Sequence, residues 1–327
     1  MSIALSILSE SWPIRGSFKI SRGAKTSADV IVVELKEGDH IGRGECVPYA
    51  RYGESQESVS NLIMSLQDDL NNGLDRLGLQ DALPGGAARN ALDCAFWDLE
   101  AKQAGKRVWN CLDLQDFKKL TTAYTLSLDS PEVMGKKAKD SAHLPLLKLK
   151  LAGPGDLDRV AAVRQGAPSS RIIVDANEGW TAEIYKDLAP KLVSLGVEMI
   201  EQPLPAGNDA ILSEIERPVP VCADESCHGV KSLSDIVGKY DMVNIKLDKT
   251  GGLTEALALR SAAEEAGLGI MVGCMLATSL AMAPAMMVAQ GVKVVDLDGP
   301  LLLDKDRDHG LKIENGLMSP PQDILWG

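Results

Sequence analysis

The stretch Pro145-Leu-Leu-Lys-Leu-Lys-Leu151 decides how the rest of the chain is interpreted. Successive side chains of a β-strand point to opposite faces, so Lys148 and Lys150 would leave the same face of an otherwise apolar strand. Two ammonium groups side by side in a core carry a large desolvation cost. The segment is therefore either an amphipathic strand with its lysines in water or a strand that delivers two lysines to a functional site.

The chain from Leu120 onward repeats one pattern, in which short β-rich runs alternate with segments of helical composition. The spacing from strand to strand is about 22 to 27 residues, which predicts parallel βαβ units. Helices are expected over 180–195, 253–266 and 276–289. Eight strands fit an α/β fold, a (β/α)7β TIM-type barrel that lacks its final helix. The strand candidates are 121–128, 145–151, 171–175, 197–202, 219–224, 241–247, 268–274 and 292–298.

The first part of the chain has a different pattern. Residues 2–13 and 29–45 are strand candidates, the second with a turn at Gly38-Asp39, and helices are expected over 56–74 and 86–103. Strands followed by helices predict an N-terminal α+β capping domain over residues 1–115, followed by the barrel over 116–300. The segment 301–327 has a turn at Asn315-Gly316, and we expect it to return to the cap.

Composition limits the possible partners. The 327 residues carry a formal net charge of −12, which argues against binding to nucleic acid or to an anionic membrane. No apolar run is long enough to cross a bilayer, and the first residues lack the pattern of a secretory signal. Six cysteines without paired metal spacing indicate reduced thiols, so the expected location is cytoplasmic. Nothing in the sequence excludes a homo-oligomer.

Acidic residues end three successive strand candidates, at Asp175, Glu201 and Asp224. In a barrel of this type the functional residues lie at the C-terminal ends of the strands, so these three should converge. Converging carboxylates repel one another unless a cation joins them, and an all-oxygen set favours a hard ion, most simply Mg²⁺. Either aspartate alone could instead cap the helix that follows it, but capping does not account for three acids in register.

Lysines end the second and sixth strand candidates, at Lys150 and Lys246. These strands are opposite each other in a closed ring of eight. A substrate carbon held between the two amines could lose a proton from one face and regain it on the other. On the eighth strand, Asp296 and Asp298 share one face. They would suit a positively charged substrate group such as an α-ammonium, unless they form a salt bridge within the barrel or a simple turn.

These residues resemble the enolase superfamily and, within it, the muconate-lactonizing subgroup. Asp296-Leu-Asp298 is similar to the pattern of the dipeptide epimerases. The subgroup resemblance rests on Lys148-Leu-Lys150, Asp175-Ala-Asn-Glu178, Glu201-Gln-Pro203, Asp224-Glu-Ser226 and the run from Asn244 to Gly252.

The resemblance implies a role for each matching residue. It implies one Mg²⁺ per subunit on Asp175, Glu201 and Asp224, and acid/base catalysis by Lys150 and Lys246. It further implies the substrate-binding residues Arg22, Thr125, Lys148, Cys274, Asp296 and Asp298. Among these, Lys148 would contact the substrate carboxylate, Asp296 and Asp298 the dipeptide ammonium, and Arg22 the side-chain carboxylate of a glutamate. Two loops, 21–23 and 48–54, would close the barrel.

The activity implied by the resemblance is Mg²⁺-dependent epimerisation of a small dipeptide. L-Ala-L-Glu and L-Ala-D-Glu would interconvert by 1,1-proton transfer through a metal-stabilised enediolate, as in the recycling of murein peptides. One alternative on the same frame is a dipeptide epimerase of another specificity. A further one is another reaction, such as that of an o-succinylbenzoate synthase, a muconate cycloisomerase or an N-acylamino acid racemase, whose substrates carry no ammonium. The last is a non-catalytic barrel, against which the complete set of carboxylates and lysines argues.

Overall fold

Eight parallel strands form the sheet around which the second half of the chain is built. The computed structural model describes residues 3–327. Neighbouring strands are hydrogen-bonded in sequence order, and the Ala123 N–H donates to the Val295 carbonyl oxygen at 2.8 Å, which joins the first strand to the last. The expected barrel and all eight of its strands are therefore confirmed. The strands are β5 (Tyr124–Leu126), β6 (Leu146–Lys150), β7 (Arg171–Asp175), β8 (Val197–Glu201), β9 (Val221–Ala223), β10 (Met242–Ile245), β11 (Gly269–Gly273) and β12 (Val294–Asp296).

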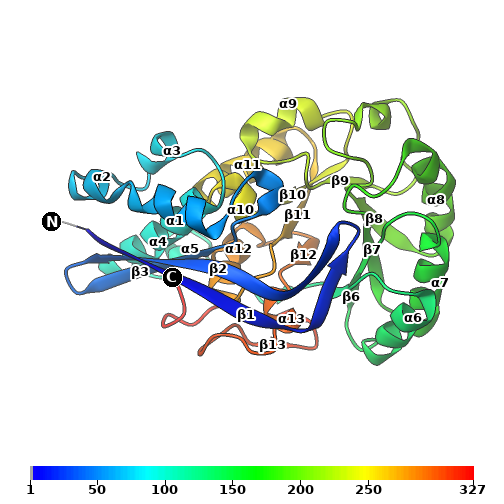
Figure 1. Ribbon diagram of the computed structural model, residues 1–327, viewed down its shortest axis with the longest axis horizontal. Coiled ribbons are helices and arrows are strands. Elements are labelled where there is room, and N and C mark those ends of the chain that lie inside the picture. The colour runs from blue at the N-terminus through cyan, green and yellow to red at the C-terminus, as the bar shows by residue number, and fades with distance from the viewer. Residues whose placement is uncertain (1–2) are drawn as a thin grey trace.

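Helices cover the outside of this barrel unevenly (Figure 1). The three helices expected from the sequence are confirmed as α8 (Ala182–Ser194), α11 (Leu253–Glu265) and α12 (Ser279–Val288). Between β8 and β9 the chain forms only the 3-10 turn η2 (Ala210–Ser213), because prolines at 203, 205, 218 and 220 interrupt the segment. No helix described in residues 3–327 has the length and apolar character to span a membrane. The remaining helical elements are α6 (Pro131–Asp140), α7 (Asp156–Gly166), η3 (Val230–Ser232), α9 (Leu233–Ile236), α10 (Leu247–Thr250) and α13 (Gly299–Leu302).

The first domain pairs an antiparallel sheet with a buried helix. The sheet contains β1 (Ala4–Ile20), β2 (Gly23–Glu37) and β3 (His40–Cys46) in that order. Helix α4 (Ala87–Gln103) packs so closely on β3 that a Cβ at Gly42 or Gly44 would lie 2.1 or 2.0 Å from a carbonyl oxygen of the helix. Glycine at these two positions is therefore a packing requirement. The other elements are η1 (Ala50–Tyr52), α1 (Gln56–Met64), α2 (Gln67–Asn71), α3 (Leu79–Ala82) and α5 (Val108–Cys111).

Three elements of this domain differ from the sequence-based expectation, and one of them is the strand expected from residue 29, which begins at Gly23 as β2. The helix expected over 56–74 is two helices, α1 and α2, and the Ser65 hydroxyl at the break donates to the Leu62 carbonyl oxygen at 2.7 Å. The strand expected over 2–13 continues to Ile20. Its register with β2 shifts between Pro13 and Phe18, and this irregularity interrupts the alternation that marks a strand in the sequence.

The β1–β2 hairpin extends from the first domain to the open end of the barrel (Figure 1). Its tip is Ser21-Arg22, where the sequence suggested a loop over 21–23. The Ser21 hydroxyl donates to the Asn177 carbonyl oxygen, 3.0 Å away on the loop that follows β7. The hairpin therefore brings residues from the beginning of the chain to the strand ends.

The C-terminal segment contacts both parts of the chain. Strands β13 (Ile313–Glu314) and β14 (Leu317–Met318) form a hairpin that pairs with β4 (Leu120–Thr121). The buried Trp326 indole donates to the Cys94 carbonyl oxygen of α4 at 3.0 Å. The domain limits 1–115, 116–300 and 301–327 stay a prediction.

Candidate active site

The predicted metal ligands and acid/base residues lie at one end of the barrel. Lys150 pairs in register with Asp175, which pairs with Glu201 on the next strand. Asp224 directly follows β9, and Lys246 directly follows β10. All five side chains are buried. Parallel strands in register are what bring these residues, far apart in the sequence, to the same place.

Each of the three carboxylates has one oxygen anchored by a fixed donor and the other turned toward a lysine. The anchoring donors are the Asn177 N–H to Asp175 Oδ1 (2.8 Å), the Asn244 amide to Glu201 Oε1 (2.7 Å) and the Lys249 ammonium to Asp224 Oδ1 (2.6 Å). The second oxygen of each carboxylate lies 2.6 Å from a lysine Nζ. The pairs are Asp175 with Lys150, Glu201 with Lys148 and Asp224 with Lys246. The anchors hold the second oxygens in fixed positions.

These second oxygens form the all-oxygen donor set that a hard divalent cation prefers. Among residues 3–327, no three His, Cys, Asp or Glu side chains already stand close enough together to hold a metal ion. Within the described part of the chain, Glu201 Oε2 nevertheless accepts no hydrogen bond, and its one charged contact is the Lys148 ammonium group 2.6 Å away. A buried carboxylate oxygen without a donor is a site suited to a cation. The residues therefore fit a divalent cation, and binding would exchange lysine contacts for metal contacts.

The buried charges shift one another's pKa. Burial alone would raise the pKa of Asp175, but Lys150 and Lys148 lower it to about 2. Burial and the neighbouring Asp175 raise the pKa of Glu201 to about 7. Burial alone would lower the pKa of Lys246, but Asp224 and Glu201 outweigh it and raise the pKa well above its usual value. Lys246 is thus held as an ammonium, the form that can donate a proton.

Asp296 ends β12, and Asp298 follows two residues later, immediately before α13. Asp296 Oδ2 accepts from Lys148 at 2.7 Å, while Asp296 Oδ1 has no hydrogen-bond partner among residues 3–327. Asp298 Oδ2 accepts from the Thr125 N–H at 2.6 Å. Burial and Asp296 raise the pKa of Asp298 to about 7. The structure therefore brings Lys148, Thr125, Asp296 and Asp298 together, and their substrate-binding roles stay a prediction.

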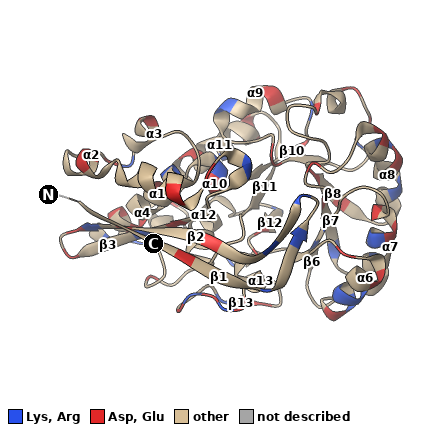
Figure 2. Cartoon of the chain, in the orientation of Figure 1, with Lys and Arg blue, Asp and Glu red and all other residues tan. Residues whose placement is uncertain are grey.

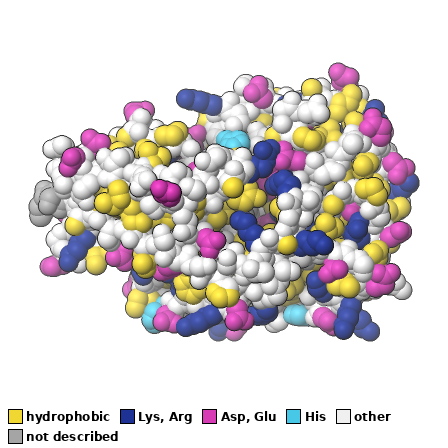
Figure 3. All heavy atoms as spheres, in the orientation of Figure 1, with side chains coloured by type: hydrophobic (Ala, Val, Ile, Leu, Met, Phe, Trp, Pro, Cys, Tyr) yellow, Lys and Arg dark blue, Asp and Glu magenta, His cyan; other side chains and the backbone are white. Residues whose placement is uncertain are grey.

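A cavity of about 540 Å³ opens above the strand ends. Figure 3 shows Lys and Arg side chains gathered around this hollow in the face, and Figure 2 shows positive residues near the hairpin tip beside it. Six of the predicted site residues are buried and do not line this cavity: Lys148, Thr125, Asp175, Glu201, Asp296 and Asp298. Thr125 instead lines a second cavity of about 280 Å³. The predicted residues that line the main cavity are Arg22, Lys150, Asp224, Lys246 and Cys274.

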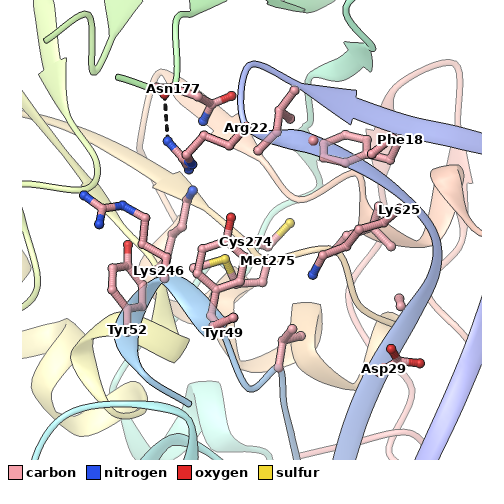
Figure 4. A pocket seen from close by; sticks show the side chains of 18 of the residues that line it. Phe18, Arg22, Lys25, Asp29, Tyr49, Tyr52, Asn177, Lys246, Cys274 and Met275 are labelled. Carbon is pink, nitrogen blue, oxygen red and sulfur yellow. Dashed lines mark hydrogen bonds between the residues drawn. The ribbon is translucent and has the colours of Figure 1, made fainter. Parts of the chain in front are cut away.

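Arg22, at the hairpin tip, is surrounded by acceptors of the barrel loops. Its guanidinium donates to the Asn177 carbonyl oxygen (2.7 Å, Figure 4), to Glu178 (3.0 Å) and to Glu225 (2.7 Å). Arg51, in the predicted closing loop 48–54, donates to both oxygens of Glu178 at 2.8 and 2.6 Å. The Glu178 carboxylate thus connects the barrel to both segments of the first domain that reach the cavity, the hairpin tip and the loop 48–54.

Several residues of the site received no role from the sequence. Asn244 and Lys249 anchor metal-binding candidates, Glu178 and Glu225 hold Arg22, and the Gln202 side-chain carbonyl accepts from the Asp224 N–H at 2.9 Å. All five lie inside the motifs on which the resemblance rests. Their positions in those motifs were the available signal, but a motif does not show which atoms a side chain contacts.

Comparison with known proteins gives the same family over most of the chain. The profile of the mandelate racemase / muconate lactonizing enzyme N-terminal domain matches residues 2–112, and the enolase C-terminal domain-like profile matches residues 134–324. The chain is 46% identical to the L-Ala-D/L-Glu epimerase of Escherichia coli K12, with 95% of this chain and 97% of that protein covered. It is 45% identical to an N-acetyl-D-glutamate racemase of a Pseudoalteromonas species, with 91% and 95% covered.

Solved structures give the same result. An enolase family member from Agrobacterium tumefaciens, with homology to dipeptide epimerases and with bound sodium and L-Ala-L-Glu, superposes with a TM-score of 0.98. It is 51% identical and covers 99% of this chain and 100% of its own. A dipeptide epimerase from Cytophaga hutchinsonii, complexed with Mg and D-Ala-L-Val, gives a TM-score of 0.91 at 27% identity, with 98% and 94% covered.

Proposed function

Because the chain belongs to the mandelate racemase / muconate lactonizing enzyme family of the enolase superfamily, we propose that it epimerises the C-terminal residue of a dipeptide. The proposed substrates are L-Ala-L-Glu and L-Ala-D-Glu, and the proposed setting is the recycling of murein peptides. Similarity to an L-Ala-D/L-Glu epimerase over 95% of this chain supports the substrate class.

The observation that carries this proposal is the pair of lysines at the cavity. Lys150 and Lys246 come from β6 and β10, four strands apart in a ring of eight, and both line the same cavity. Each ammonium lies 2.6 Å from a different carboxylate, so the two lysines are fixed independently. An α-carbon between them can lose its proton to one lysine and receive a proton from the other on the opposite face.

Asp175, Glu201 and Asp224 are the residues that would hold Mg²⁺. When bound, the cation would supply positive charge for the substrate carboxylate as negative charge develops next to the α-carbon. The chain's own residues would orient the dipeptide. Asp296 Oδ1 has no hydrogen-bond partner among residues 3–327 and would accept from the dipeptide ammonium once substrate binding displaces the residues that separate it from the cavity. Lys148 would contribute a positive charge beside the carboxylates.

Proton exchange tests this proposal directly. Incubation of each dipeptide in D₂O with Mg²⁺ should remove the ¹H NMR signal of the glutamate α-proton and produce the other diastereomer, and EDTA should stop both changes. Lys246→Ala should abolish α-proton exchange from one diastereomer more severely than from the other, and Lys150→Ala should show the opposite preference. Lys191→Ala, on the exposed surface of α8, is the matched control. Equal loss of exchange from both diastereomers would contradict one lysine per face.

A second candidate is racemisation of an N-acyl glutamate. A carboxyl group with a pKa near 7, such as Asp298, can be neutral and donate to an acyl oxygen instead of pairing with an ammonium. The relative that racemises N-acetyl-D-glutamate gives this option weight. N-Acetyl-glutamate in the same NMR assay separates the two candidates: exchange that is faster than with either dipeptide would favour the second.

Location is part of the proposal. All six cysteines are free, which supports a reducing compartment and hence the cytoplasm. Fractionation of the native host, with periplasmic and cytoplasmic marker enzymes as controls, tests this placement.

A further inference from the structure

Five cationic side chains line the main cavity, and four of them already have a carboxylate partner. Lys150 pairs with Asp175 and Lys246 with Asp224, both at 2.6 Å. Arg22 and Arg51 both pair with Glu178, and Arg22 also pairs with Glu225. Within residues 3–327, the fifth, Lys25, forms no ion pair.

Arg22 has little capacity left for a further anion. The cluster of Arg22, Arg51, Glu178 and Glu225 contains two positive and two negative charges, so it is neutral as a unit. Glu225 is buried, and its Oε2 already lacks a hydrogen-bond donor. A substrate carboxylate placed on Arg22 would therefore add a third negative charge to this cluster. That arrangement is electrostatically unfavourable unless another cation takes part.

Lys25 is in position to be that cation. It lies on β2, three residues beyond the tip residue Arg22, and pairs across the hairpin with Phe18. Figure 4 shows its side chain extending into the cavity from the hairpin, toward Met275. Its Nζ lies 5.3 Å from the centre of the Tyr49 ring. The nearby Asp29 also lines the cavity, but its carboxylate accepts from Ser11 at 2.6 Å and is not paired with Lys25.

We propose that Lys25 selects an acidic C-terminal residue by pairing its ammonium group with the side-chain carboxylate of the substrate. The inference rests on the proposed function, because it names the group that distinguishes among dipeptides at the same site. It also separates two tasks: Arg22 holds the hairpin tip on the barrel through Asn177, Glu178 and Glu225, and Lys25 supplies the unpaired charge.

The test compares L-Ala-L-Glu with its uncharged isostere L-Ala-L-Gln. Lys25→Met should lower kcat/KM for the glutamate dipeptide by about fivefold, the upper end of the range for a solvent-exposed ion pair, through a higher KM. The glutamine dipeptide should be unaffected, and Lys25→Arg should restore the preference. Lys19→Met is the matched control, because it removes the same charge from an exposed position on the same hairpin and does not line the cavity. Arg22→Met should impair both dipeptides alike.

The outcomes separate this inference from the proposed function. A wild-type protein that exchanges neither α-proton would overturn both. If the wild type is active and Lys25→Met keeps the preference for the glutamate dipeptide over the glutamine dipeptide, the inference alone is overturned. A fall in kcat/KM for only the glutamate dipeptide in Arg22→Met would overturn it as well. A fall in kcat/KM for only the glutamate dipeptide in Lys25→Met, with Lys19→Met unchanged, would support the inference.

Discussion

Glu178→Gln should release both segments of the first domain from the barrel mouth. The Glu178 carboxylate accepts from Arg22 at 3.0 Å, from Arg51 at 2.8 and 2.6 Å and from the Ala206 N–H at 2.8 Å. The glutamine keeps the size of the side chain and one carbonyl oxygen, and it removes the charge shared by the two arginines. The substitution therefore tests the ion pairs and not the packing.

The magnitude follows from the exposure of the partners. The Arg22 and Arg51 side chains are 29% and 34% exposed, so each ion pair is partly screened by water. Only the Arg22 pair holds the hairpin tip, so at about 1 kcal/mol its loss corresponds to about a fivefold increase in the population with the tip detached. Loss of the Arg51 pair would release the loop 48–54 by a similar amount.

Trypsin provides the assay, because it cleaves after arginine and lysine only where the backbone is locally open. When opening and closing are fast relative to cleavage, the initial rate of cutting after Arg22 in the native protein should rise about fivefold. Glu198→Gln is the matched control, since Glu198 also binds an arginine through both oxygens (Arg171, 2.8 to 3.1 Å) but does so where β7 begins. An equal rise in the control, a uniform rise at all tryptic sites, or a change below about threefold at Arg22 would refute the reasoning.

Three further predictions concern stability and metal binding. Burial raises the pKa of Asp248 to about 7, so its carboxyl favours the unfolded state as pH rises from about 4 to 7. In urea unfolding, Asp248→Asn should match the wild type near pH 4 and exceed it by up to about 4 kcal/mol at pH 8. Gln202→Leu removes the acceptor of the Asp224 N–H and should weaken Mg²⁺ binding in calorimetry by about tenfold or more. Trp326→Ala empties a fully buried site and should lower the free energy of unfolding by about 3 to 5 kcal/mol.

The barrel and its strand ends could be predicted because their signals are local. A buried parallel strand is a short apolar run, and Asp175 and Glu201 end two such runs. Once strands are parallel and in register, residues at their ends must meet, so the converging carboxylates followed without any knowledge of side-chain contacts. The family comparison later gave the same fold.

The parts that could not be predicted depend on contacts between distant segments. The extension of β1 to Ile20 is stabilised by pairing with β2, and the register shift near Phe18 hides the alternation. The sequence could not show that Arg22 pairs with Glu178 and Glu225, because both glutamates lie more than 150 positions after Arg22 in the chain. Local pattern identifies which residues reach the barrel mouth, and only the fold determines which of their charges remain unpaired.

The pairing of charges also determines how the lysine variants should be interpreted. Lys150 and Lys246 each contact a different carboxylate, Asp175 and Asp224, and each of these carboxylates has a second lysine within 3.3 Å, Lys148 for the first and Lys249 for the second. Removing one acid/base lysine therefore leaves its carboxylate in contact with a second ammonium group and leaves the opposite lysine in place. A single lysine variant should thus keep its fold and report the proton transfer on one face of the substrate, which is the condition that makes a difference between the two diastereomers informative.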